Sequence, residues 1–155
     1  MSDNERWGTD LRLLRDLRQQ NDRHPGRDLF VKERLATGRV DLETLTAEDN
    51  LAQALLLRFL TERGELAALG HENYGSRLYE LIGQPNTESN RNRARLYVLE
   101  ALVQEPRVAE LLNVTVRTSR ADPGRIDIDL TVRAIRSDTT LNLVFPFFLE
   151  GGFSA

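Results

Sequence analysis

The sequence predicts an α+β fold, with two main helices packed on a small antiparallel sheet that is formed largely by C-terminal strands. Apolar residues recur at helical spacing in two segments, residues 46–60 and residues 90–104. Between residues 113 and 148 the period changes, and apolar residues alternate with polar ones as in strands that have one buried face. These two helical segments and the alternating segment together define the predicted class.

Length, charge and cysteine content limit the classes of protein to which this chain can belong. The 155 residues are enough for one domain with a core, and 40% of them are hydrophobic. The formal net charge of -3 gives no general signal for nucleic acid or membrane binding. The sequence has no cysteine, which excludes disulfides, zinc–thiolate sites and cysteine nucleophiles. It shows no signal peptide and no membrane-spanning apolar run, so we expect a cytoplasmic protein without membrane insertion.

The N-terminal part of the chain has the weakest pattern, and we treat residues 1–45 as an extension of a main domain at residues 46–155. Leu11, Leu14 and Leu17 recur at helical spacing, but residues 10–14 also alternate as in a short strand, so helix and strand both stay open. The remaining expectations for this part are a loop at residues 21–27 and short strands at residues 29–31 and 40–42.

The two helices have recognisable starts and apolar sides. Thr46-Ala47-Glu48-Asp49 resembles a capping box, and the helix after it is apolar around much of its circumference, which predicts burial on several sides. Arg91, Arg93 and Arg95 stand near the start of the second helix, either as a solvated face or as a basic contact patch for an acidic partner. The predicted buried stripe of this second helix consists of Leu96, Val98, Leu99, Leu102 and Val103.

A corner with several turn signals lies between the helices. Gly64 follows Glu62-Arg63 as a typical helix C-terminus, and Gly70 and Gly75 bracket residues 71–74. Ser76 can cap a short helix that ends before Gly83. So many turn signals predict a fixed shape, which is either a plain structural corner or a contact site.

The alternating segment predicts a meander of three strands, at residues 113–119, 125–133 and 141–148, with turns at residues 122–124 and 137–139. The second helix ends at Glu105-Pro106-Arg107, because proline cannot continue a helix. We expect both charges to be exposed on this rigid turn. The apolar positions of the last two strands are Ile126, Ile128, Leu130, Val132, Leu141, Leu143 and Phe145.

Catalytic patterns are absent from the sequence. His24 and His71 lie far apart and have no ligand spacing, so we expect no metal site. Asp127 and Asp129 share the polar face of one strand and are weak candidates for a carboxylate pair. There is neither a phosphate-binding loop nor a nucleophile elbow, and we expect no cofactor and no catalytic residue.

Several motifs occur in an order that resembles a known family. They are an apolar helix, Gly64-Glu65, Tyr74-Gly75-Ser76-Arg77-Leu78, a helix that closes on Glu105-Pro106-Arg107, and a strand meander. Together they resemble the phage baseplate-wedge family named after gene W and gene twenty-five, which includes sheath initiators of contractile injection systems. The similarity spans about residues 50–148. Leu66 stands where many members have arginine, and Glu72 and Tyr74 stand near the usual proline and phenylalanine.

Three further segments look most like the branch of extracellular contractile injection systems: Asn50-Leu51-Ala52-Gln53-Ala54, Gly70-His71 and Leu141-Asn142-Leu143-Val144-Phe145-Pro146. The resemblance implies a structural baseplate protein of a phage-tail-like particle. It would nucleate the sheath by exchanging strands with sheath subunits, and Glu105-Pro106-Arg107 would bind wedge proteins. Inner tube and hub proteins are further candidate partners. Some family members carry a lysozyme name, so a peptidoglycan hydrolase is the alternative function, and an adaptor of an unrelated assembly is a third.

Overall fold

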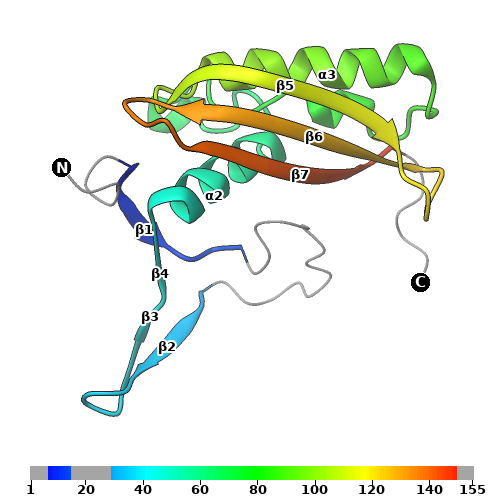
Figure 1. Ribbon diagram of the computed structural model, residues 1–155. Coiled ribbons are helices and arrows are strands. Elements are labelled where there is room, and N and C mark those ends of the chain that lie inside the picture. Colours follow the sequence, from blue (N-terminus) through cyan, green and yellow to red (C-terminus); the bar gives the residue numbers. More distant parts are fainter. Residues whose placement is uncertain (1–6, 15–28, 150–155) are drawn as a thin grey trace.

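The structure is a computed structural model that describes residues 7–14 and 29–149. A C-terminal antiparallel sheet is covered on one face by α2 and α3, and short N-terminal strands lie beyond α2 (Figure 1). The predicted α+β class is therefore confirmed. In chain order the elements are β1 (Thr9–Leu11), β2 (Val31–Arg34), β3 (Arg39–Leu42), β4 (Thr44–Thr46), α2 (Ala47–Leu60), η1 (Ala67–Leu69), η2 (Leu78–Leu81), α3 (Glu88–Val103), β5 (Val108–Thr118), β6 (Arg125–Ala134) and β7 (Thr140–Phe148).

The C-terminal sheet has the strand order β5-β6-β7, so β6 is central. Its pairing with β7 runs without a register shift from Arg125↔Phe148 to Arg133↔Thr140. The β5–β6 pairing shifts register twice near the start of β5, which begins at Val108 rather than at the predicted residue 113. The three predicted strands are otherwise confirmed. Their residues alternate between apolar and polar because a strand with one buried face places successive side chains on opposite sides.

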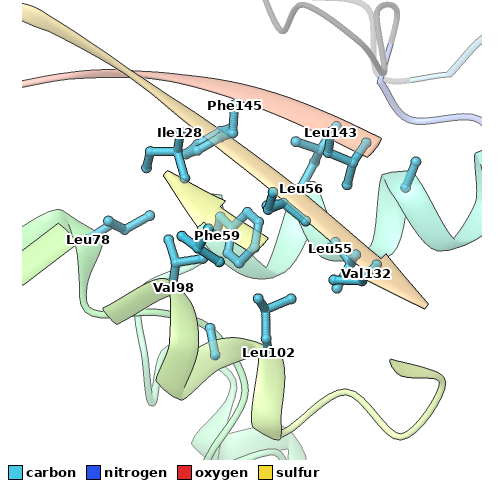
Figure 2. Close-up of a cluster of buried hydrophobic side chains, with 14 of the residues drawn as sticks. Leu55, Leu56, Phe59, Leu78, Val98, Leu102, Ile128, Val132, Leu143 and Phe145 are labelled. Carbon is cyan, nitrogen blue, oxygen red and sulfur yellow. The ribbon is translucent and has the colours of Figure 1, made fainter. Parts of the chain in front are cut away.

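The core lies between this sheet and the two helices (Figure 2). Phe59 of α2 lies 5.6 Å from Phe145 of β7 between ring centroids, which joins the helix directly to the sheet. Every apolar position predicted for the last two strands is buried and belongs to this core. Leu78, from the corner, fills the same core beside Val98 of α3.

The predicted buried stripe of α3 is wrong in part. Leu96 is 51% exposed and Val103 is 82% exposed, whereas Val98 and Leu102 are buried as expected. The buried face instead includes Tyr97 and the small residues Ala94 and Ala101. Alanines at helical spacing let the helix approach the layer beneath it closely, and apolarity alone does not reveal that preference.

Both helices start close to the predicted places, but the capping predicted for the first helix is absent. Thr46 is the extended N-cap residue of α2, yet its side chain makes no capping hydrogen bond, so the expected capping box is wrong. At α3, the Thr87 hydroxyl accepts a hydrogen bond from the Asn90 backbone N–H at 3.2 Å, and the helix therefore begins earlier than residue 90.

The described N-terminal residues form two small strand pairs. β1 pairs with β4, which confirms a strand in the segment that was open between helix and strand. β2 and β3 form a hairpin near the predicted places. Leu17, His24 and the loop predicted at residues 21–27 lie outside the described residues. Trp7 and Leu45 are buried in the same core as α2, while the domain boundary at residue 45 stays a prediction.

Candidate functional site

The corner after α2 is closed by backbone hydrogen bonds. The Ser76 N–H donates to Thr61 O at 2.9 Å, and the Arg63 N–H donates to Ser76 O at 3.0 Å. Gly75, with φ +102°, lies so close to this crossing that a Cβ would be 2.6 Å from Glu62 O. Gly64 also has the predicted positive φ, of +88°. The expected fixed shape is therefore present.

Ser76 joins the two sides of the corner. Its hydroxyl donates to Phe59 O at 2.8 Å and accepts from the Leu78 N–H at 3.3 Å. The segment that follows is the 3₁₀ turn η2 rather than an α-helix. The N-cap residue of η2 is Arg77, and its side chain makes no capping hydrogen bond, so the predicted capping by Ser76 is wrong. Ser76 instead bonds the Leu78 N–H from one position earlier and also satisfies a carbonyl at the end of α2.

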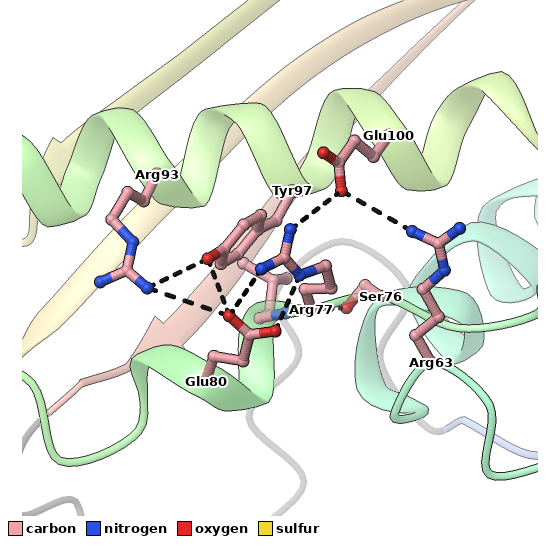
Figure 3. A network of polar contacts seen from close by, with 8 residues as sticks. Arg63, Ser76, Arg77, Glu80, Arg93, Tyr97 and Glu100 are labelled. Carbon is pink, nitrogen blue, oxygen red and sulfur yellow. Dashed lines mark hydrogen bonds and ion pairs between the residues drawn. The ribbon is translucent and has the colours of Figure 1, made fainter.

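A charged network links the corner to the side of α3 (Figure 3). Arg77 pairs with Glu80, with 2.7 Å between Nε and Oε1, and its guanidinium lies 4.5 Å from the centroid of the Tyr97 ring. The Tyr97 hydroxyl donates to Glu80 Oε2 at 2.8 Å. The hydrogen bonds from Arg77 and then from Tyr97 lower the pKa of Glu80 below its ordinary value. Arg77 of the corner motif thus fixes the corner to α3.

Two arginines of the corner also reach one carboxylate of α3. Arg63 and Arg77 each lie 3.9 Å from Glu100 Oε2 (Figure 3). All three side chains are more than a third exposed, so each pair contributes little to stability by itself. These two pairs instead help to orient the corner, because they join it to α3 at a second place besides the Arg77–Glu80 pair.

The three arginines at the start of α3 do not act as one group. Arg91 donates to Asn86 Oδ1 at 2.8 Å, and Arg93 lies 3.9 Å from Glu80 Oε2. Arg95 is exposed. The three arginines of the predicted patch therefore lie in different surroundings.

Glu105 occupies the most enclosed charged position of the described chain. Only 4% of the residue is exposed, which makes the expected exposure of this side chain wrong. Its Oε2 lies 3.3 Å from Arg58 Nη2, and its Oε1 accepts from Arg107 Nε at 2.6 Å. The Arg58 guanidinium in turn lies 4.5 Å from the centroid of the Tyr74 ring. Glu105 thus bridges α2, the corner and the turn after α3.

The electrostatics of this site follow from burial and from two cations. Burial alone would raise the pKa of Glu105, but the hydrogen bond and charge of Arg107, together with the charge of Arg58, lower it overall. Burial raises the pKa of the Tyr74 hydroxyl in spite of the nearby Arg58. Glu105 is therefore held as a carboxylate between two arginines.

This pKa shift predicts a pH dependence of stability. The pKa of Glu105 in the folded protein lies below its ordinary value of 4.5, so its stabilisation is complete above that value and is lost as the pH falls through the folded pKa. Denaturant unfolding of the native protein and of Glu105→Gln should give a constant difference in free energy of unfolding at higher pH, and a shrinking one at lower pH. An unchanged difference at pH 3 would contradict this assignment.

Sequence patterns did not reveal Arg58. It is the one cation inside the buried helix α2, and its partner Glu105 follows 47 residues later. A charged residue at a buried helical position signals that a partner exists. The pattern does not identify that partner, because the pairing depends on the tertiary fold.

The edge of β7 is the second candidate site. The Leu149 N–H donates to Gly124 O, which continues the ladder toward β6. Since backbone groups alternate in direction along a strand, the N–H groups of Asn142, Val144 and Phe148 point away from β6. Pro146, which has no N–H, occupies this outward series, the position that a sheet tolerates best. Among the described residues, β7 pairs with β6 alone.

The opposite edge, on β5, is less suited to further pairing. Its register shifts between Val108 and Glu110 and again between Leu111 and Asn113. Such irregularities disrupt the ladder and bend the strand. Helix α3 also lies along β5, and Arg91 of this helix reaches the Thr118 hydroxyl at 3.4 Å (Figure 1). β7 therefore offers the longer regular edge.

A solved structure with this architecture is the crystal structure of a candidate tail lysozyme from Geobacter sulfurreducens. It is 30% identical in sequence, with a TM-score of 0.59, and the match covers 70% of this chain and 96% of that chain. The chain belongs to the tail-lysozyme family of phage tail baseplate proteins. No family model matches the sequence of this baseplate protein, and no curated protein sequence matches it at a significant level.

Two further structural findings concern the baseplate protein. In the ranges 7–14 and 29–149, no group of three or more histidine, aspartate or glutamate side chains has a metal-binding arrangement. Within the same ranges, no helix has both the length and the apolar composition needed to cross a membrane.

Proposed function

We propose that this baseplate protein nucleates the contractile sheath of a phage-tail-like injection system. The observation that carries the proposal is the regular edge of β7, whose outward backbone groups have no partner among the described residues. An incoming sheath strand would complete the ladder through main-chain hydrogen bonds, and its alternating side chains would fix the register. The extracellular branch of such systems is the one that the sequence motifs favour.

The turn after α3 supplies the second proposed contact, with wedge proteins. Pro106 is exposed and Arg107 is half-buried, whereas Glu105 lies beneath them. We assign partner contact to Pro106 and Arg107, and we assign to Glu105 the role of holding the Arg107 guanidinium at 2.6 Å. The corner motif serves the same arrangement, because Tyr74 covers Arg58. Inner tube and hub proteins remain further proposed partners.

The name of the Geobacter structure favours a second candidate function, peptidoglycan hydrolysis, and the carboxylates give it little support. A general acid of this class needs an apolar environment that raises its pKa. Among the described residues Glu105 is the one buried carboxylate, and its pKa is lowered. Asp127 pairs with Arg125 at 3.0 Å and lies with Asp129 in a hollow that arginines also line. We therefore propose an assembly protein without hydrolase activity.

Proline at the β7 edge should separate folding from sheath assembly. In Asn142→Pro the missing N–H is one that points away from β6, so the isolated protein should keep its free energy of unfolding to within about 1 kcal/mol. An incoming sheath strand would lose a ladder hydrogen bond and meet the proline ring. We expect normal chemical unfolding but strongly reduced sheath formation, measured by electron microscopy of particles and by co-purification with sheath subunits.

Two variants control this experiment. Asn142→Ala removes the same side chain, including the 2.8 Å contact between Thr131 Oγ1 and Asn142 Oδ1, but keeps the N–H, and it should assemble normally. Leu143→Pro removes an N–H that points to β6 and should unfold the protein. Proline at Asp127 or Asp129 would not be informative, because β6 pairs on both sides. Normal sheath formation by Asn142→Pro, or clearing of cell-wall material by the purified native protein, would contradict the proposal.

A further inference from the structure

The β2–β3 hairpin extends away from the sheet and helices (Figure 1). All residues of its two strands are exposed, including the aliphatic side chains of Val31 (62%) and Val40 (67%). Leu35, in the connecting turn, is fully exposed. The described part of the chain places nothing over these aliphatic residues, although a two-stranded hairpin by itself is only marginally stable in water.

The two faces of the hairpin have different chemistry. Val31 pairs with Leu42, and Glu33 pairs with Val40, so one face carries three aliphatic side chains and one carboxylate. The other face carries the pairs Lys32↔Asp41 and Arg34↔Arg39. This face has three cations and one anion, and two of the cations stand directly opposite each other. Like charges in that position destabilise a strand pair.

The root of the hairpin is fixed. The Glu43 N–H donates to Phe30 O at 2.8 Å, and the Arg12 N–H donates to Glu43 O at the same distance. Arg12 Nη1 also pairs with Glu43 Oε1 at 2.9 Å, and its guanidinium lies 5.6 Å from the centroid of the Phe30 ring. The hairpin is thereby held to the strand pair beneath it and points in a defined direction.

Both edges of the hairpin present free backbone groups. Because the Glu43 N–H bonds Phe30 O, the alternation along the ladder turns the backbone groups of Val31 and Glu33 outward on one edge, and those of Val40 and Leu42 outward on the other. The Leu42 N–H donates to Asp41 Oδ1 at 2.9 Å, so the free N–H on the β3 edge is that of Val40. Within the described ranges β2 and β3 pair only with each other. An added strand could therefore extend the hairpin by main-chain hydrogen bonds.

The charges of the hairpin favour one kind of added strand. Arg34 pairs with Asp41, with 2.5 Å between Nη2 and Oδ2, whereas Lys32 and Arg39 form no ion pair with another described residue. An added strand places alternate side chains on opposite faces. If these alternate between aliphatic and acidic, the aliphatic ones extend the Val31–Val40–Leu42 face and the acidic ones approach Lys32 and Arg39.

We infer that the β2–β3 hairpin is a docking arm for an extended segment of a partner protein in which aliphatic and acidic side chains alternate. This role goes beyond sheath nucleation at β7, and it uses a different edge of the molecule. Binding combines strand addition with charge complementarity, so it weakens as salt screens the exposed charges.

The test measures binding of a short fluorescent peptide, in which valine and glutamate alternate, to the full-length protein by fluorescence anisotropy. We expect saturable binding that weakens with added salt, and no binding of the matched valine–lysine peptide. Lys32→Glu combined with Arg39→Glu should weaken binding about tenfold or more, which corresponds to at least about 1.4 kcal/mol. The same charge change at the exposed residues Arg117 and Arg120 is the matched control and should have little effect.

Proline variants identify which edge of the hairpin binds the peptide. Proline at Glu33 or at Val40 removes an outward N–H from β2 or β3, and one of these changes should abolish binding while Asn142→Pro at the β7 edge leaves it intact. Equal binding of the lysine peptide, unchanged binding by the charge-reversed hairpin, or loss of binding in Asn142→Pro alone would overturn the inference. So would concentration-dependent dimers in sedimentation that Val40→Asp abolishes, because the occupant would then be a second copy of this chain.

Discussion

Replacement of Glu105 by alanine is expected to lower the free energy of unfolding by about 3–5 kcal/mol, the usual cost of leaving one buried charge without its partner. Arg58 would lose the carboxylate 3.3 Å from its Nη2, in a place where its side chain is 8% exposed. Its Nε already lacks a hydrogen-bond partner among the described residues, so the guanidinium would be left largely unsatisfied. Urea denaturation followed by circular dichroism measures this loss.

A surface pair provides the matched control for Glu105. Glu110 pairs with Arg133, and both side chains are well exposed, so Glu110→Ala should change the free energy of unfolding by less than about 1 kcal/mol. The loss in free energy of unfolding for Arg107→Ala should lie between those of Glu105→Ala and Glu110→Ala, since Arg107 is partly exposed and Arg58 would still neutralise Glu105. Equal effects of Glu105→Ala and Glu110→Ala would show that the buried bridge contributes no special stability.

The second large effect is expected at Gly75. A methyl group there would lie 2.6 Å from Glu62 O and 2.7 Å from Thr61 O, and both atoms belong to the backbone. Overpacking typically costs about 1–3 kcal/mol, and a left-handed backbone costs a non-glycine residue about 1–2 kcal/mol more. Gly75→Ala should therefore lose roughly 2–5 kcal/mol, or fail to accumulate as soluble protein.

Gly70→Ala separates the cost of overpacking from the cost of the left-handed backbone. Gly70 also has a positive φ, of +86°, but a Cβ there would meet no atom within 4 Å. This variant should lose only the backbone contribution, about 1–2 kcal/mol, with an otherwise unchanged unfolding transition. If Gly75→Ala is no less stable than Gly70→Ala in thermal and urea unfolding, the close approach of the corner to the end of α2 is not maintained in solution.

The strands show what sequence periodicity can predict. Ile126, Ile128, Leu130 and Val132 alternate strictly because one face of β6 meets the helices and the other meets solvent. The glycine turns were predictable for a similar reason, since a positive φ favours glycine at positions such as Gly75. In both cases the signal comes from a residue and its immediate neighbours.

The errors arise where contacts between distant segments decide the structure. Leu96 and Val103 are apolar, but the packing of α3 buries Ala94 and Ala101 instead. Glu105 looked like a surface residue because its partner Arg58 belongs to another helix. Local patterns also could not identify β7 as an open edge, because that depends on the strand order of the finished sheet.

Amide hydrogen exchange at β7 tests the central proposal most directly. It would be measured with residue-level mass spectrometry on the isolated protein and on the same protein assembled with sheath subunits. We predict that the amides of Asn142 and Val144 exchange rapidly in the isolated protein and become protected on assembly, while the amides of Leu143 and Phe145 are protected in both states. Protection of Asn142 and Val144 before the sheath is added, or their continued rapid exchange in the assembled particle, would contradict nucleation at this edge.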